Sequence, residues 1–214
     1  MDYVIGALIA IGLLFLISFT HELGHYYSLL AFGIPVKEFS IGFGPVLYQE
    51  KDKTTTSLRL FPAISYVDFN LQDISHLPPV KKIIIFVAGP IVNIVLGIIC
   101  FIVIPDATIV LWDIFLRDSP HIILGPVTFV FLITRIIQKG WWRVVVLLGF
   151  LSFATGLLNL APLPALDGRW ALGVLRNESL EKIEISATKS IKFITLATLV
   201  LGLIDITLVI TIGL

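Results

Sequence analysis

Three ionisable side chains that could do chemistry lie close together near the start of the chain, in the stretch Thr20-His21-Glu22-Leu23-Gly24-His25. His21 and His25 are four residues apart, so on a helix they share one face, with Glu22 one step round. Two neutral imidazoles at this spacing can hold a zinc ion, and the neighbouring carboxylate can take a proton from a water molecule that the metal activates. The pattern predicts a hydrolytic metal centre.

This motif interrupts a run of residues, 2–32, that is otherwise apolar enough for a transmembrane helix. A charged group near the bilayer centre costs about 2.5–3.5 kcal/mol on insertion scales, so such groups are rare and usually functional. We therefore favour a metal site over the alternative, a buried cluster of polar packing residues. At ~1.5 Å per residue, His21 lies roughly 28 Å along the helix from Asp2, near the far edge of a ~30 Å hydrocarbon layer.

The composition indicates a polytopic membrane protein. Hydrophobic residues make up 57% of the 214 residues, charged residues 14%, and the mean hydropathy is +0.99. The net charge is zero, so we expect no nucleic-acid partner. Cys100 is the single cysteine, which excludes a disulfide framework. We expect an all-α membrane protein that forms a single intramembrane domain.

Four apolar segments are predicted to span the membrane, at about 3–32, 82–104, 143–164 and 190–213. Between the first two, residues 36–70 predict a β-hairpin loop that lies against the membrane or dips into it. In this loop we expect a strand through Ser40–Tyr48, a polar turn at Lys51–Thr54 and a returning strand at Ser57–Phe61.

Residues 105–142 are the ambiguous part of the chain. Four charged residues predict an aqueous loop: Asp106, Asp113, Arg117 and Asp118. A fifth span after this loop is disfavoured, because Gly125-Pro126 breaks the apolar run and only about 15 residues follow. We expect instead an interfacial helix at about 126–140, with Trp141 and Trp142 as anchors.

The end of the third span carries an unusual run, Asn159–Gly168. Pro162 and Pro164 cannot both lie in a regular helix, so the chain is predicted to unwind here against protein or a water-filled cavity. Asp167, just past this break, is the natural third, oxygen ligand of the metal. The alternative for Asp167 is a helix N-cap.

Two other membrane segments carry polar or small residues. In the second, Gly89, Asn93 and Gly97 recur every fourth residue, which predicts a face for close packing on a neighbouring helix. Asn93 could also hydrogen-bond a group of the site, so we count it among the candidate substrate-binding residues. Asp205, in the fourth segment, is interpreted as snorkelling or paired rather than catalytic.

The distribution of Lys and Arg predicts the orientation. With four spans, one side of the membrane receives eleven of them and the other side four. The eleven are Lys37, Lys51, Lys53, Arg59, Lys81, Lys82, Arg169, Arg176, Lys182, Lys189 and Lys192. This excess predicts that the HELGH end of the first span faces the cytoplasm. The third span then runs in the same direction as the first, which brings Asp167 to the level of His21 and His25.

Four motifs together resemble the site-2 protease family of intramembrane zinc metalloproteases. They are HELGH at 21–25, SIGFGP at 40–45, GPIVN at 89–93 and NLAPLPALDG at 159–168. The bacterial branch that regulates sigma factors by cutting membrane-bound anti-sigma factors is the closest match, and the resemblance spans almost the whole chain.

The resemblance implies roles for particular residues. His21, His25 and Asp167 would bind zinc, and Glu22 would be the general base. The substrate-binding cleft would be shaped by Asn159, Pro162 and Pro164. The 36–70 loop would be a membrane-re-entrant hairpin that receives an extended substrate.

The chain also departs from this branch. Members usually carry one or two PDZ domains between the second and third spans, whereas only about 38 residues separate them here, so the chain lacks those domains. Arg169 follows Asp167-Gly168 where a second glycine is usual, and Ile64-Ser65 stands where paired glycines are common. These changes concern substrate range and loop conformation rather than the metal ligands.

We therefore expect a zinc metalloprotease of the cell membrane that hydrolyses peptide bonds in or near transmembrane segments. Its partners would be the lipid bilayer and single-span membrane proteins, such as anti-sigma factors or signal-peptide remnants. The alternatives are a zinc-binding membrane scaffold without activity and, with less support, a metal transporter. An intact Glu22 disfavours the scaffold, and the scarcity of ionisable residues in the second and fourth spans disfavours the transporter.

Overall fold

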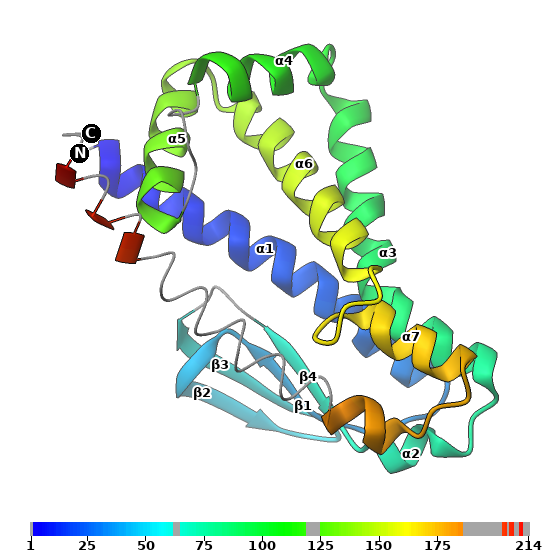
Figure 1. Ribbon diagram of the computed structural model, residues 1–214. Coiled ribbons are helices and arrows are strands. Elements are labelled where there is room, and N and C mark those ends of the chain that lie inside the picture. The colour runs from blue at the N-terminus through cyan, green and yellow to red at the C-terminus, as the bar shows by residue number, and fades with distance from the viewer. Residues whose placement is uncertain are drawn as a thin grey trace.

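The computed structural model describes residues 2–61, 65–118 and 125–185, with the short pieces 203–204, 206–207 and 210–211. In the described part, three helices are long and apolar enough to cross a membrane (Figure 1). They are α1 (Asp2–Ala31), α3 (Pro79–Val103) and α6 (Trp142–Asn159). These helices correspond to the first three predicted spans. Asp205 and most of the predicted fourth span, 190–213, lie outside the described residues.

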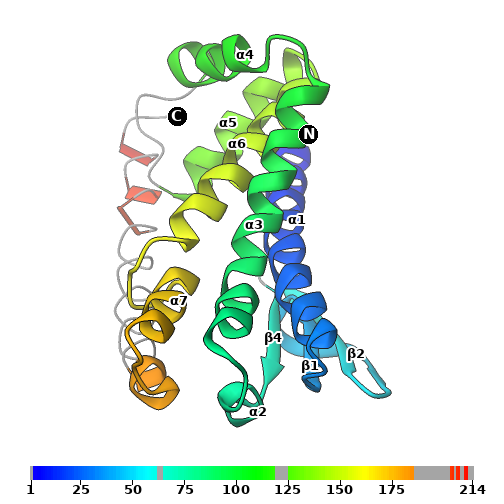
Figure 2. The same cartoon turned by 90° about the vertical axis from the view of Figure 1, so that its right-hand side faces the viewer.

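Helix α3 packs against both α1 and α6, and Figure 2 shows it between them. The contact with α6 is close because glycines meet there. A side chain at Gly97 would come within 2.7 Å of the Gly149 carbonyl oxygen, and one at Gly156 within 2.6 Å of the Pro90 carbonyl oxygen. The packing face predicted from Gly89, Asn93 and Gly97 is confirmed, since all three are buried.

The outward surfaces of α1 and α3 are apolar. Leu8 and Ile11 of α1 and Ile98 and Ile102 of α3 are exposed, although they are large hydrophobic residues. A helix that is apolar both inside and outside the bundle suits a lipid environment better than water. The structure is therefore that of a multi-pass membrane protein.

Residues 36–69 form a four-stranded sheet with the strand order β2-β3-β1-β4. The strands are β1 (Val36–Ile41), β2 (Phe43–Lys51), β3 (Thr55–Phe61) and β4 (Tyr66–Phe69). Strands β2 and β3 make the hairpin that the sequence predicts, while β1 pairs in parallel with β3 and antiparallel with β4. The single strand predicted through Ser40–Tyr48 is wrong, because Gly42, at φ +88°, separates β1 from β2.

The segment predicted as an aqueous loop is helical. Helix α4 (Ala107–Asp113) continues into the π-helical turn η1 (Ile114–Asp118), and Figures 1 and 2 show α4 lying across the end of the bundle opposite the sheet. The prediction of a loop is wrong, and one of its four charged residues, Asp113, is only 20% exposed because it is paired within the protein, whereas Arg117 is 79% exposed. Asp113 lies 2.5 Å from Arg143 Nη2 of α6 and 3.1 Å from Arg117 Nη1, and the first of these contacts holds the pKa of Asp113 below its usual value.

Helix α5 (Pro126–Gln138) corresponds to the helix predicted at 126–140. Its 13 residues are fewer than a membrane span requires. The helix packs along α1 and α6 and buries Leu132, Ile133 and Ile136 in the bundle. Its predicted location at the membrane surface stays a prediction.

Helix α6 ends at Asn159, earlier than the predicted end at 164, because Pro162 and Pro164 cannot continue it. The following loop leads into α7 (Asp167–Leu175), and the short helix α2 (Leu71–Ser75) joins β4 to α3. The first turn of α7 lies directly on the end of α6, since a side chain at Gly168 would overlap the Leu160 carbonyl oxygen. The loop and α7 therefore form a compact return toward α3.

The glycine contacts between helices lead to a stability prediction. Gly156→Ala places a methyl group against the Pro90 carbonyl, so we expect it to destabilise the detergent-solubilised protein by roughly 1–3 kcal/mol. Gly12→Ala is the matched control, because Gly12 is exposed on α1 and has no heavy atom within 4 Å of an added Cβ. The thermal unfolding midpoint should fall for the first variant only. Equal midpoints would show that the helices tolerate a wider separation.

Candidate metal centre

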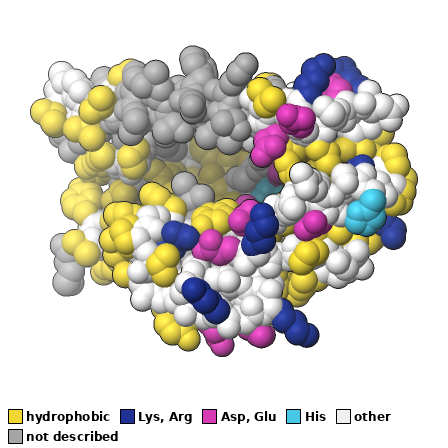
Figure 3. Space-filling view, turned by 90° about the horizontal axis from the view of Figure 1, so that it is seen from below, with side chains coloured by type: hydrophobic (Ala, Val, Ile, Leu, Met, Phe, Trp, Pro, Cys, Tyr) yellow, Lys and Arg dark blue, Asp and Glu magenta, His cyan; other side chains and the backbone are white. Residues whose placement is uncertain are grey.

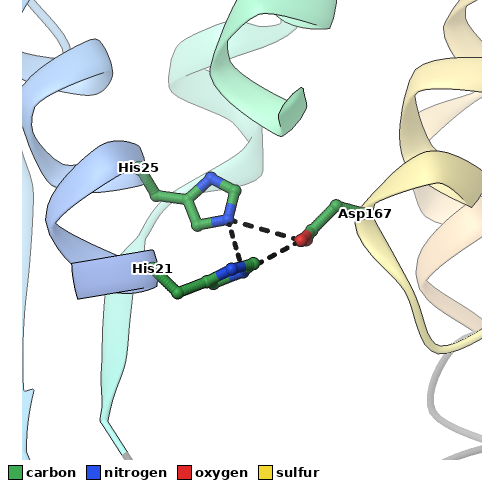
Figure 4. A group of neighbouring side chains, drawn as sticks. All are labelled: His21, His25 and Asp167. Carbon is green, nitrogen blue, oxygen red and sulfur yellow. Dashed lines mark hydrogen bonds and ion pairs between the residues drawn. The ribbon is translucent and has the colours of Figure 1, made fainter. Parts of the chain in front are cut away.

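Two histidines on the last turns of α1 point toward the same space. His21 and His25 are four residues apart, and their Nε2 atoms lie 3.2 Å from each other (Figure 4). Both side chains are largely buried, with relative exposures of 11% and 12%. The helical spacing seen in the sequence thus places two imidazoles side by side, as expected.

Asp167 meets these histidines from the first turn of α7. Its Oδ2 atom lies 3.0 Å from His21 Nε2 and 3.5 Å from His25 Nε2 (Figure 4). The potential ligand atoms of the three residues all lie within 4.8 Å of one another. The structure therefore brings together the three side chains that the sequence singled out as metal ligands.

The position of Asp167 depends on how α7 is held. Trp170 stacks on Phe86 of α3, with ring centroids 5.3 Å apart, and Ala171 and Val174 belong to a buried cluster that includes Ile85. These contacts fix the first turn of α7 against α3. They thereby hold Asp167 where it faces His21 and His25 of α1.

His25 is oriented by the backbone of α3. Its Nδ1 atom donates a hydrogen bond to the Ile85 carbonyl oxygen at 2.8 Å, which leaves Nε2 of the neutral ring without a proton. The ring fits because Gly24 and Gly89 face each other where α1 and α3 cross. A side chain at Gly89 would collide with the His25 ring, and one at Gly24 would lie 2.6 Å from the Ala88 carbonyl oxygen.

His21 is oriented by Asn93, which is fully buried. Asn93 Nδ2 lies 3.4 Å from His21 Nδ1, and Asn93 Oδ1 accepts a hydrogen bond from Thr20 Oγ1 at 3.1 Å. A half-turn of the amide would bring Oδ1 to His21 Nδ1 and leave Nε2 free of a proton, which is the tautomer that a metal ligand needs. Asn93 thus acts on His21, and its predicted contact with substrate stays a prediction.

The three residues fit a zinc ion. Ligands placed tetrahedrally at the usual zinc distances are about 3.3 Å apart, which matches the observed separations of 3.0, 3.2 and 3.5 Å. Apart from the two imidazole nitrogens, the buried Asp167 Oδ2 has no hydrogen-bond donor in the described structure. Two imidazoles and one carboxylate form a donor set typical of catalytic zinc, which keeps a fourth position for water or substrate.

Glu22 shares a cavity with this centre. The cavity, of about 290 Å³, is lined by Glu22, His25 and Asp167 and also by Val67, Asp68 and Phe69 of β4. Glu22 and β4 therefore face the same space. Figure 3 shows the end of the molecule that bears the sheet, where a histidine lies deep in a hollow and acidic side chains lie nearby.

The other predicted site residues lie at the last residue of α6 and in the loop that follows it. Asn159 donates a hydrogen bond to the Thr155 carbonyl oxygen at 3.1 Å, and Pro162 and Pro164 are exposed in the loop after α6. None of the three lines the cavity beside Glu22, so their part in substrate binding stays a prediction.

The sequence analysis assigned no role to Thr20, to the Ile85 carbonyl or to Val67. Thr20 could have been found, because it precedes His21 in the motif. The role of the Ile85 carbonyl could not have been predicted, because every residue has a backbone carbonyl and the residue type does not show which one is used.

Comparisons with known proteins find sequence similarity to a peptidase family and to proteins named as zinc metalloproteases. The sequence profile described as Peptidase family M50 matches residues 8–202. A protein of Fusobacterium nucleatum, named as a candidate zinc metalloprotease, is 36% identical over 105 residues, which are 45% of this chain and 31% of that protein.

Two further relatives carry the same kind of name. The protein of Campylobacter jejuni is 34% identical over 116 residues, 48% of this chain and 32% of its own length. That of Clostridium perfringens is 35% identical over 109 residues, 47% of this chain and 32% of its own length. The matched segments therefore cover about a third of each relative.

The contact between Asn93 and His21 leads to a metal-binding prediction. Asn93→Leu keeps the size of the side chain but removes the hydrogen bond to His21, so we expect zinc affinity to fall by about 10- to 100-fold. Competition with a fluorescent zinc chelator measures this affinity.

Thr134→Val is the control for this variant. Thr134 is also a buried polar residue of a helix, but its hydroxyl bonds only to the Val130 carbonyl within α5. Zinc affinity should be unchanged in Thr134→Val. If Asn93→Leu bound zinc as tightly as the parent, Asn93 would have no part in holding His21.

Proposed function

The chain belongs to peptidase family M50, and from this premise we propose that it is an intramembrane zinc metalloprotease that cuts peptide bonds in or near transmembrane segments. The observation that carries the proposal is the convergence of His21, His25 and Asp167 beside Glu22, in a cavity at one end of an apolar helix bundle. A scaffold or transporter would need no carboxylate poised next to the ligand set.

His21, His25 and Asp167 would hold the metal, with two nitrogens and one oxygen within reach of a common point. When bound there, zinc would supply Lewis-acid chemistry by polarising a peptide carbonyl and making a water molecule easier to deprotonate. The residues behind the ligands keep them in place, since Ile85 fixes one imidazole and Asn93 contacts the other.

Glu22 would move the proton. Glu22 lines the same cavity as His25 and Asp167. There it can accept a proton from the attacking water and later give that proton to the leaving amine. Helix α1 thus supplies both ligands and base from one stretch of five residues, 21–25.

The orientation of the molecule supports cleavage near the cytoplasmic surface. Most of the Lys and Arg residues assigned above to the cytoplasmic side lie on the sheet, at the start of α3 and on or after α7, at the same end as the metal centre. The four on the other side lie on η1, α5 and the start of α6, or next to them. This asymmetry supports a site that opens to the cytoplasm.

The substrate class follows from the same placement. A site inside an apolar bundle meets polypeptides that are themselves in the bilayer, so single-span membrane proteins are the proposed substrates. Anti-sigma factors and signal-peptide remnants are examples of this class. A helical substrate hides its carbonyls in its own hydrogen bonds, so it must unwind before it can reach the metal centre.

Glu22→Gln tests the proposal. The amide cannot accept a proton but keeps the size and polarity of the side chain, so we expect the cleavage rate to fall by roughly 10²- to 10⁴-fold while bound zinc is retained. Cleavage of a model single-span substrate in detergent, with and without a zinc chelator, provides the rate, and elemental analysis provides the zinc content.

His25→Ala is the companion variant, which should lose zinc and cleavage together. A parent protein that binds zinc but cuts no membrane substrate would favour the scaffold instead. Zinc flux in proteoliposomes that persists in Glu22→Gln would favour the transporter.

A further inference from the structure

One face of the sheet carries a cluster of polar contacts centred on Arg59 of β3. Arg59 Nε donates to Ser40 Oγ at 2.8 Å, Nη1 to the Gly44 carbonyl at 3.0 Å, and Nη2 to Glu38 Oε1 at 2.7 Å. Nη2 also donates to the Tyr66 hydroxyl at 2.7 Å. We call these five residues the arginine clasp.

The clasp joins all four strands. Glu38 and Ser40 belong to β1, Gly44 to β2, Arg59 to β3 and Tyr66 to β4. The Tyr66 hydroxyl in turn donates to Glu38 Oε2 at 3.1 Å, which closes a ring of three side chains. Only a guanidinium has donors in the planar fork needed to reach these partners together, so lysine could not replace Arg59 here.

The clasp carries opposite charges at neutral pH. Partial burial opposes ionisation of Glu38, but hydrogen bonds from Ser57, Arg59 and Tyr66 outweigh it and hold its pKa below the ordinary value. The side chains of Arg59 and Glu38 are only 19% and 21% exposed. An ion pair enclosed to this extent, with each partner also hydrogen-bonded elsewhere, fixes the relative position of the strands.

Strand β4 is the part of the sheet that meets the metal centre. It is an edge strand of four residues that pairs, among the described strands, only with β1. Val67, Asp68 and Phe69 line the cavity that contains Glu22. The position of this short strand therefore shapes the cavity in which Glu22 lies.

Two side-chain contacts hold β4 just before Val67. The backbone N–H of Ser65 donates to Ser18 Oγ of α1 at 2.7 Å, and the next residue, Tyr66, is held by Arg59 and Glu38. The first contact ties β4 to the helix that carries Glu22, and the second ties it to the rest of the sheet. A strand of four residues paired on one side has few other means of keeping its register.

We propose that Arg59 is a positioning residue for the reaction, because through Tyr66 it holds β4 in place as a wall of the cavity that contains Glu22. This inference rests on the proposed proton-transfer role of Glu22, and it adds a residue that touches neither the metal ligands nor the cavity. Arg59 acts on the reaction through Tyr66 and the strand that Tyr66 begins.

Tyr66→Phe and Arg59→Lys test the proposal. Tyr66→Phe removes the hydroxyl and keeps the aromatic ring. Arg59→Lys keeps the positive charge but lacks the planar set of guanidinium N–H donors. In both we expect kcat on the model single-span substrate to fall roughly 10- to 100-fold, the size of effect that a misplaced catalytic group produces. KM should stay within about twofold, since the loss concerns the chemical step, and bound zinc should be unchanged.

Tyr48→Phe is the matched control, because it removes the same hydroxyl from another tyrosine of the sheet. Tyr48 lies on β2, is 61% exposed, and its hydroxyl has no hydrogen bond to any described residue. This variant should keep the parent kcat, KM and zinc content. The proposal is overturned if Tyr66→Phe and Arg59→Lys keep the parent kcat, or lose activity only in proportion to lost zinc.

Backbone hydrogen exchange tests the same proposal without any substrate. In Tyr66→Phe we expect the peptide covering 65–69 to exchange about tenfold faster than in the parent, with no change in Tyr48→Phe. If the 65–69 peptide exchanged at the parent rate in Tyr66→Phe, the proposed role of the arginine clasp in holding β4 would be overturned. A parent protein that fails to cleave would instead refute the proposed function, and the exchange data would still decide the role of Arg59.

Discussion

The crossing of α1 and α3 is the contact on which the rest of the site depends. Gly24 and Gly89 remove the side chains that would otherwise keep the two backbones apart. The space gained is just enough for the His25 ring, whose Nδ1 reaches a carbonyl of α3 at 2.8 Å. Because α3 also carries Asn93, the same crossing orients both histidines. Two helices packed at a normal distance would leave these rings free to rotate.

Several polar groups of the bundle form one connected set in a largely apolar interior. Thr20 of α1 and Ser152 of α6 each donate a hydrogen bond to Asn93 of α3, and this set continues through His21 to Asp167. In an apolar environment each of these groups would be costly without a partner. The need for satisfied hydrogen bonds therefore keeps the ligands in one arrangement before any metal is bound. The hydrogen bonds that stabilise these buried polar groups are therefore the same ones that preorganise the ligand side chains.

The sequence predicted those parts of the fold that have a local signature. The spacing of His21 and His25 indicated two ligands on one helix. The prolines before Asp167 indicated an unwound backbone next to a possible third ligand, which the family resemblance then supported over a helix N-cap. Long apolar runs indicated α1, α3 and α6. The parallel pairing of β1 with β3 has no such signature, because it depends on contacts between distant residues. Asp113 misled for a related reason: its partner Arg143 lies 30 residues away, so the charge suggested exposure to water.

The ligand set is divided along the chain, with two histidines in the first helix and the aspartate after the third apolar helix. Because α7 follows α6, the Asp167 carboxylate can reach the two imidazoles only once both elements have been synthesised and α7 has folded back. On the proposed function, a nascent chain that ends before α7 would therefore carry no activity.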